Sequence, residues 1–256
     1  MEPPQRPLEG KVVLVTGAGV RVGRAIAEAA GRAGASVAIH FHASEAPADE
    51  TLRAIRADGN RAARFRADLS DPAAAEPLAA AVEAELGPIT ALVNSAAIIE
   101  RAPFLETSAG ALERQWAINA RGPYMLTQAV ARRMLARGGG DVVNVLDIAG
   151  VFNWWRFYSA YCMTKAAMAA LTRCLALELA PAIRVNGVAP GAVLPPEATE
   201  PAALETIRAA VPQQRLGSPE DVARAVLFLL TGPSYVTGQI IAVDGGRSLG
   251  SARPPA

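Results

Sequence analysis

The chain has 256 residues, of which 51% are hydrophobic and 19% charged, and its formal net charge is +1. This length and composition are typical of a globular protein with a sizeable core and exclude a disordered chain. The balanced charge gives no reason to expect nucleic acid or an anionic membrane surface as a partner.

The first part of the chain alternates between strand-like and helix-like segments. An apolar run at 11–17 ends in glycine and predicts a strand that is buried on both faces. Residues 22–35 follow it with the apolar spacing of a helix. The next segments are a strand at 36–42, a helix at 48–59, a strand at 61–69, a helix at 71–87 and a strand at 89–97.

The second part continues the alternation with two long helices. They are expected at 112–137 and 159–180, with a strand at 141–147 between them. Two further strands are expected at 183–191 and 239–246. We expect one domain at 11–247, with flexible tails at 1–10 and 248–256.

Strands that alternate with helices predict a parallel sheet with right-handed crossovers. The predicted fold class is therefore α/β: a single-domain Rossmann-type doubly wound sheet of about seven strands, with helices on both faces. Ligands of such folds bind beyond the carboxyl ends of the strands, where the strand order reverses. This rule places four stretches in one crevice: 16–23, 94–97, Asp147 and 190–191.

A glycine-rich turn joins the first strand to the first helix. Gly17 permits a sharp turn, and Gly19 and Gly23 permit close backbone approach, although the spacing is not the usual G-x-G-x-x-G. The free N–H groups of the helix that follows suit a pyrophosphate. A nucleotide site is favoured over a purely structural turn.

Residues at the end of the second strand indicate which nucleotide binds. No acidic residue precedes Glu45 to bind a ribose 2′-hydroxyl, whereas Arg21, His42 and Ser44 suit a 2′-phosphate. We therefore predict NADPH as the cofactor, the alternative being a solvated Arg21 and ordinary strand histidines. No further metal-ligating residues accompany the two histidines, His40 and His42, so no metal site is expected.

Tyr161 and Lys165 lie four residues apart and share one face of the second long helix. A nearby ammonium is expected to lower the pKa of Tyr161 from its usual value of about 10. Such a tyrosine can give a proton to a carbonyl or imine as a hydride arrives. Asp147, at the end of the preceding strand, should point into the same site.

Together these motifs resemble the short-chain dehydrogenase/reductase family. The resemblance rests on the glycine turn, "NSAA" at 94–97, "YCMTK" at 161–165, "PG" at 190–191 and "VDGG" at 243–246. It implies that Tyr161 is the proton donor, that Lys165 holds the ribose and tunes Tyr161, and that Asn119 supports a water relay. The implied cofactor residues are Gly17, Gly19, Arg21, Val22, Gly23, His42, Ala43, Ser44, Asp68, Leu69, Asn94, Ser95, Ala96, Tyr161, Lys165, Pro190 and Gly191.

Two departures from the common family pattern resemble the pteridine reductase branch. Most members have Gly at the position of Arg21 and Ser at the position of Asp147, and the branch has both departures. It also has a second tyrosine where this chain has Tyr158, and its Asp helps to deliver a proton to the pterin. We predict Asp147 as catalytic, and Ile99, Tyr158 and Trp155 as substrate contacts.

The loops around the predicted site leave two questions open. Ile98 and Ile99 stand where that branch has a stacking aromatic, so Trp154 and Trp155 are expected either to cap a flat ring or to bury an oligomer interface. The segment 192–217 resembles the family's mobile substrate loop or is a plain surface connection.

The preferred function is NADPH-dependent reduction of a pteridine. The alternative is a carbonyl reductase, for example of a 3-oxoacyl thioester, and a third hypothesis is an NADP-binding sensor without turnover. Asn119, Tyr161 and Lys165 argue against the sensor. The resemblance implies a homotetramer, and the lack of a signal peptide or apolar span predicts a cytoplasmic protein.

Overall fold

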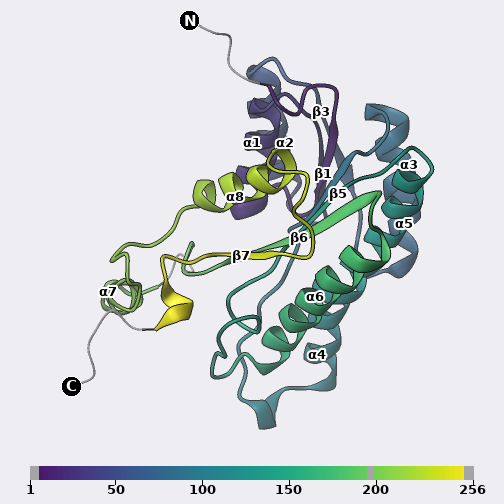
Figure 1. Ribbon diagram of the computed structural model, residues 1–256. Helices are drawn as coiled ribbons and strands as arrows, with labels where there is room; N and C mark the ends of the chain where they lie inside the picture. The colour runs from purple at the N-terminus through teal and green to yellow at the C-terminus, as the bar shows by residue number, and fades with distance from the viewer. Residues whose placement is uncertain (1–5, 195–198, 251–256) are drawn as a thin grey trace, which may run out of the picture.

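A parallel sheet of seven strands runs through the molecule in the order β3-β2-β1-β4-β5-β6-β7 (Figure 1). The computed structural model describes residues 6–194 and 199–250. The strands are β1 (Val12–Val15), β2 (Ser36–Phe41), β3 (Ala62–Arg66), β4 (Ala91–Asn94), β5 (Gly140–Val145), β6 (Ile183–Pro190) and β7 (Ile240–Val243). The predicted Rossmann-type sheet is confirmed.

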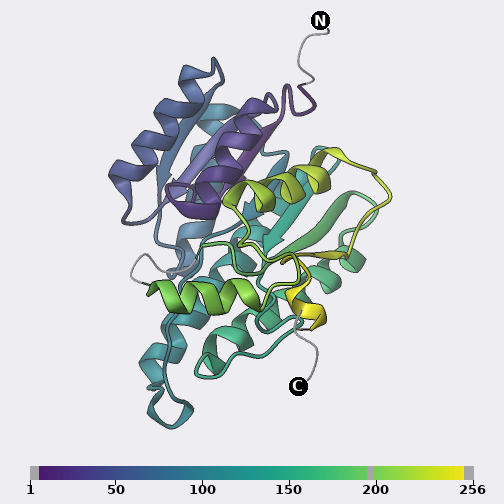
Figure 2. The same ribbon diagram turned by 90° about the vertical axis from the view of Figure 1, so that its left-hand side faces the viewer.

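Helices cover both faces of the sheet (Figures 1 and 2). One face carries α1, α2 and α8, and the other carries α3, α5 and α6. The helices are α1 (Arg21–Arg32), α2 (Glu45–Ala57), α3 (Ala75–Leu86), α4 (Ala109–Trp116), α5 (Gly122–Leu135), α6 (Ser159–Glu178), α7 (Pro201–Ala209) and α8 (Pro219–Thr231). Short 3₁₀ turns occupy Pro72–Ala74, Phe104–Glu106 and Arg247–Leu249.

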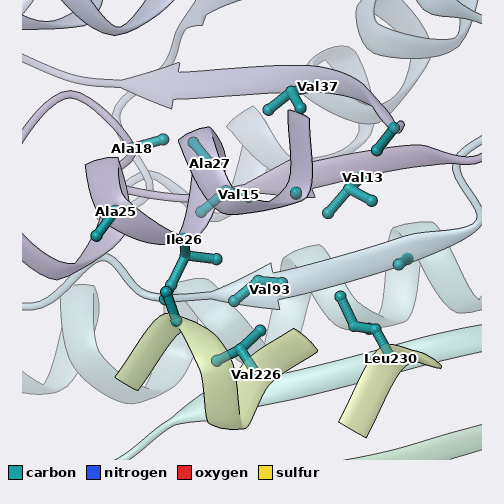
Figure 3. Packing of buried hydrophobic residues seen from close by; sticks show 14 of the residues in the cluster. Val13, Val15, Ala18, Ala25, Ile26, Ala27, Val37, Val93, Val226 and Leu230 are labelled. Atoms are coloured by element: carbon teal, nitrogen blue, oxygen red, sulfur yellow. The ribbon is translucent and has the colours of Figure 1, made fainter. Parts of the chain in front are cut away.

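Both faces of the central strand β1 are buried, which explains the unbroken apolar run in its sequence. Val13 and Val15 belong to the core under α1 and α8, while Val12 and Leu14 belong to the core under α3 and α5. Figure 3 shows Val15 beside Ala27 of α1. Each such side chain contributes about 1.5–3 kcal/mol by leaving water.

The path of the chain creates the crevice at the carboxyl ends of the strands. β1 pairs with β2 on one side and with β4 on the other, so the chain moves outward to β3 and then crosses back. The loops after β1 and β4 therefore separate and leave space between them. This is the switch point at which a ligand is expected.

Two expectations about local structure need correction. Residues 112–137 do not form one α-helix, because a π-helical segment at Ala117–Arg121 separates α4 from α5. The first ten residues are not wholly a free tail, because Leu8 is buried and its amide donates to the carbonyl of Ala33. The segment 192–217 contains α7; its residues 195–198, like residues 1–5 and 251–256, lie outside the described residues.

Among residues 6–194 and 199–250, every helix is too short or too polar to cross a bilayer.

Candidate active site

A cleft of about 490 Å³ opens at the carboxyl ends of β1, β2, β4, β5 and β6. It brings together most of the residues predicted to bind a cofactor. Those that line it are Gly17, Arg21, Val22, Gly23, His42, Ala43, Ser44, Asp68, Leu69, Ser95, Ala96, Tyr161, Lys165, Pro190 and Gly191. Asp147 and Ile99 line the same cleft, so the predicted reacting groups and cofactor residues share one space.

At the glycines of the turn after β1, a side chain would meet neighbouring atoms. Gly17 has a φ of +64°, and a Cβ there would lie 2.9 Å from the Cα of Ala96. A Cβ on Gly23 would lie 2.2 Å from the carbonyl oxygen of Gly17. Gly19 does not line the cleft but packs the turn against Ser44 at the start of α2, where a Cβ would lie 3.0 Å from the hydroxyl oxygen.

The first turn of α1 suits a phosphate group. Its N-cap is Val20, which offers no side-chain acceptor, and the first turn holds no acidic residue. The amide donors of this turn are thus free of side-chain caps and face the cleft with the positive end of the helix dipole. The geometry fits the pyrophosphate of a dinucleotide.

Arg21 and His42 flank the part of the cleft where the second strand ends. Arg21 is exposed in a left-handed conformation with a φ of 54°, and its guanidinium donates to the carbonyl oxygen of Leu194. Nε2 of His42 lies 3.8 Å from Oδ2 of Asp68. The turn and the end of β2 therefore contribute possible donors to one rim, and the end of β3 contributes the carboxylate of Asp68.

His40 has a structural role that the sequence reasoning missed. Its Nδ1 accepts from the amide of Gly17 at 3.2 Å, and its Nε2 lies 3.1 Å from the carbonyl oxygen of Ala67, to which it donates in that tautomer. Burial lowers the pKa of His40 from 6.5 to about 4. The neutral ring therefore ties the glycine turn to the end of β3.

This buried histidine should make the fold sensitive to acid. The unfolded chain takes up the proton near pH 6.5 and the folded protein only near pH 4, so stability is fully present above pH 6.5 and falls as the pH drops through this window. Between pH 6.5 and pH 4, we expect the linked protonation of His40 to lower the free energy of unfolding by about 3 kcal/mol. Urea unfolding of wild type and His40→Gln at pH 7 and 4.5 checks this. An equal loss of unfolding free energy in the two proteins between these pH values would contradict it.

Asp147 and Tyr161 are hydrogen-bonded at the floor of the cleft. The Tyr161 hydroxyl donates to Oδ2 of Asp147 at 2.9 Å, and Oδ1 accepts from the amide of Ala149 at 2.8 Å. Nζ of Lys165 donates to the carbonyl oxygen of Val145, the last residue of β5, at 3.0 Å. The end of β5 and the first turns of α6 thus place an acid, a phenol and an ammonium together.

Burial dominates the protonation of these three groups. It raises the pKa of the Asp147 carboxyl, against the opposing charge of Lys165, and lowers the pKa of Lys165 to about 8. Burial and the charge of Asp147 also raise the pKa of Tyr161 well above its usual 10. The predicted lowering of the Tyr161 pKa by Lys165 is therefore wrong in this structure.

Asn119, expected to support a water relay, is buried in the π-helical segment and does not line the cleft. Its amide group brackets Ile98 after β4: Nδ2 donates to the Ile98 carbonyl at 2.7 Å, and Oδ1 accepts from the Ile98 amide at 2.8 Å. Nδ2 also lies 3.2 Å from Oγ1 of Thr164. Asn119 thus positions the loop after β4, and π segments of this kind are frequent at functional sites.

Asn94, expected to line the cofactor, lies beneath the cleft rather than on its wall. It is buried, and its Nδ2 donates to both Thr127 and Asn144 at 2.9 Å. The next residues, Ser95 and Ala96, do line the cleft. The side chain of Asn94 therefore joins β4 to β5 and α5.

Trp155 and Tyr158, expected to contact substrate, do not line the cleft but pack beside it. Their rings meet edge to face, with centroids 5.8 Å apart and an interplanar angle of 76°. Both pack against the buried cluster of Ala149, Tyr161 and Cys162. They pack against Tyr161 from outside the cleft, whereas Ile99 lines the cleft and is 51% exposed.

Comparisons with known proteins agree with this geometry. A family model described as enoyl-(acyl carrier protein) reductase matches residues 17–248. The chain belongs to the short-chain dehydrogenase/reductase family. Two curated members are similar over 93% of this chain: L-rhamnose 1-dehydrogenase (NAD(P)(+)) of Sphingomonas sp. (strain SKA58), 36% identical over 96% of its length, and galactitol 2-dehydrogenase (L-tagatose-forming) of Cereibacter sphaeroides, 38% identical over 95%.

A solved structure of the same family has the same fold. It is a protein of Sinorhizobium meliloti 1021 assigned as a short-chain alcohol dehydrogenase, with a TM-score of 0.91 and 29% identity over 96% of this chain and all of that one. Family membership establishes an oxidoreductase that uses a nicotinamide cofactor. The curated members reported above are named as dehydrogenases of a sugar and a sugar alcohol, so the predicted pteridine reductase branch is not confirmed.

Across the described part of the chain, no group of three or more His, Cys, Asp or Glu side chains is arranged to hold a metal ion.

Proposed function

We propose that this family member interconverts a secondary alcohol and the corresponding carbonyl, with Tyr161 and Asp147 moving the proton. The observation that carries the proposal is the 2.9 Å hydrogen bond from the Tyr161 hydroxyl to Asp147 in the cleft. The names of the similar dehydrogenases support an alcohol or sugar substrate.

The proton path follows from the direction of that bond. Because the Tyr161 hydroxyl donates to Asp147, its oxygen lone pairs are left to accept from a substrate hydroxyl. During oxidation the substrate's proton passes to Tyr161 as the proton of Tyr161 passes to Asp147; reduction reverses both transfers. Burial raises the pKa of Asp147, which makes it a stronger base for this task.

Other residues would hold the cofactor and keep the geometry. The glycine turn and the first turn of α1 would bind the pyrophosphate, and Lys165 would bind the nicotinamide ribose. A bound nicotinamide cofactor supplies or accepts the hydride. Lys165 also ties α6 to β5 through Val145, which keeps Tyr161 and Asp147 in register.

We further propose that the cofactor is NADP(H). Arg21 and Ser44 line the cleft where β2 ends, and no acidic side chain of β2 or of the residues up to Ser44 is present to bind a 2′-hydroxyl. A guanidinium and a hydroxyl at this rim suit the 2′-phosphate.

Arg21→Gly tests this preference. Glycine adopts the left-handed conformation of Arg21 without strain, so the fold should persist. The Kd for NADPH should rise by about 10-fold to 100-fold, with little change for NADH. Fluorescence titration measures both, and Arg24→Gln, one turn of α1 away, is the matched control; equal losses for the two cofactors would contradict the 2′-phosphate role.

Reduction of a pteridine is the second candidate, favoured by the carboxyl of Asp147 beside Tyr161. A carboxyl can exchange protons with the ring nitrogens of a pterin, which a serine cannot. Ile98 and Ile99 line the cleft where that branch has a stacking aromatic, which weakens this candidate.

A substrate panel decides between the candidates. Purified protein is assayed for NADPH oxidation with dihydrobiopterin and an acetoacetyl thioester, and for NADP⁺ reduction with galactitol and L-rhamnose. Turnover of an alcohol, sugar or thioester supports the proposed function. Turnover of dihydrobiopterin alone would replace it with the pteridine candidate, and tight NADPH binding without any turnover would favour a sensor.

We also propose a homotetrameric, cytoplasmic protein. Large apolar side chains remain exposed on α4, α5 and α6: Leu112, Tyr124, Leu135, Met163 and Leu177. Pairing of these helices between subunits would bury them. Light scattering should then give about four times the 26.6 kDa of one chain; a monomer at micromolar concentration would contradict the tetramer.

A further inference from the structure

The two ends of the cleft differ in their side chains. The strand order places the ends of β2 and β3 on one side of β1 and the ends of β4, β5 and β6 on the other. At the first end the cleft carries the polar side chains of His42, Ser44 and Asp68. The reacting groups, Asp147 and Tyr161, lie at the second end, which is therefore where a substrate must bind.

Large apolar side chains line the cleft at this second end. Ile98 and Ile99 come from the loop after β4, and Val193 and Leu194 come from the loop after β6. Ile99 and Leu194 are exposed, so their surfaces are open to a ligand. Covering such surfaces removes apolar area from water, which favours an apolar ligand over a polar one.

Hydrogen bonds fix the loop after β4 relative to the catalytic tyrosine. The side chain of Asn119 bonds to both the amide and the carbonyl of Ile98, and its Nδ2 lies 3.2 Å from Oγ1 of Thr164. Oγ1 of Thr164 donates in turn to the carbonyl oxygen of Tyr161 at 2.7 Å. The neighbouring Ile99 is therefore held in a defined position at the reacting end of the cleft.

Few polar side chains are available there for further hydroxyl groups of a substrate. Asp147, Tyr161 and Lys165 are already used by the proposed chemistry. From β4 onward, the one other polar side chain among the described residues that line the cleft is that of Ser95. The amide of Ser95 donates to Oγ1 of Thr16 at 2.9 Å, which places Ser95 beside β1, at the middle of the sheet. A polyol bound at the reacting end would leave hydroxyl groups without side-chain partners, which weakens binding.

We propose that Ile99 and Leu194, with Ile98 and Val193 behind them, form a specificity-determining subsite for an apolar arm of the substrate. The preferred substrate is then a secondary alcohol, or the corresponding ketone, that carries a hydrocarbon chain. The inference rests on the proposed alcohol chemistry and names the substrate class for it. It separates this chain from the similar dehydrogenases named for a sugar and a sugar alcohol.

A series of alcohols measures the contribution of the apolar arm. NADP⁺ reduction is followed with butan-2-ol, hexan-2-ol and hexane-1,5-diol, which differs from hexan-2-ol only by a hydroxyl at the far end of the arm. Two additional buried methylenes should raise kcat/KM about 10-fold to 20-fold from butan-2-ol to hexan-2-ol. The terminal hydroxyl should cancel that gain. Equal kcat/KM values for butan-2-ol and hexan-2-ol, or a higher value for the diol, would overturn the inference.

Ile99→Ser removes apolar surface from the subsite, and the fold should persist because Ile99 is exposed. The ratio of kcat/KM for hexan-2-ol to that for butan-2-ol should fall by about threefold or more. Leu105→Ser is the matched control, because Leu105 is an exposed aliphatic residue further along the same loop that does not line the cleft. An unchanged ratio in Ile99→Ser, or an equal fall in Leu105→Ser, would count against the subsite.

Binding without turnover separates this inference from the proposed chemistry. Butanamide and hexanamide, whose carbonyl stands in for that of a ketone, are titrated calorimetrically into the NADPH complex of each protein. A Kd for hexanamide that is about 10-fold lower than that for butanamide in wild type, with a smaller difference in Ile99→Ser, supports the subsite. If no alcohol reacts, this result still supports the subsite, and only the proposed function fails. Equal Kd values for the two amides, or no binding of either, overturn the inference.

Discussion

Replacing Tyr161 by Phe is expected to lower kcat/KM by about 10³-fold or more, whichever substrate the panel identifies. The phenol is the group through which the substrate's proton would reach Asp147, and positioned acid–base groups contribute about 10²-fold to 10⁴-fold. Steady-state kinetics at saturating cofactor measures the loss. The ring of Phe keeps the buried contacts with Ala149 and Cys162, so the fold should persist.

The control for this variant is cofactor affinity. The hydroxyl of Tyr161 donates to Asp147, and its loss leaves the glycine turn and Lys165 in place, so the Kd for NADPH should change less than about threefold. A variant that retains most of its activity would remove Tyr161 from the proton path. A loss of NADPH binding would instead indicate that the site as a whole had been disturbed.

Asp147→Asn is expected to lower kcat/KM for alcohol oxidation by about 10²-fold and to change its dependence on pH. Asparagine can still accept from the amide of Ala149 but cannot take up the proton of Tyr161. Wild-type oxidation requires ionised Asp147, so its rate should fall as the pH drops through the raised pKa of this carboxyl. A pH profile of kcat/KM should show that acidic limb in wild type and not in the variant.

Stability distinguishes this chemical role from a structural one. A raised pKa means that the folded state disfavours the charge of Asp147, so Asp147→Asn should leave the free energy of unfolding at pH 7 unchanged or higher. Asp147→Ser, which introduces the residue most family members have here, serves as a second control without a titrating group. An acidic limb that persists in both variants would assign the titration to another residue.

The sheet and most of the cleft could be predicted from the sequence because they depend on local patterns. Apolar runs closed by glycine determine where strands end, and the switch-point rule then places Asp147 and Tyr161 at one edge. Their hydrogen bond agrees with that expectation. Gly17 and Gly23 were predictable for the same reason, since only glycine fits between neighbouring backbone segments.

The remaining features depend on contacts that no local pattern contains. The sequence did not reveal the role of His40, because its hydrogen-bond partners, Gly17 and Ala67, are distant along the chain. The direction in which Trp155 packs required the position of α6. The pKa of Tyr161 was predicted from the charge of Lys165 alone, whereas burial and the charge of Asp147 raise it.

The π-helical segment at Ala117–Arg121 links the number of residues between α4 and α5 to the geometry of the site. A π turn holds one residue more than an α turn, so it offsets by about 100° the directions in which side chains project before and after it. Deleting a single residue here would let α4 and α5 merge into one regular α-helix and would rotate the side chains on one side of the deletion by about 100° relative to those on the other. The side-chain amide of Asn119 would then turn away from Ile98. The loop after β4 would lose the hydrogen bonds that hold it near Tyr161.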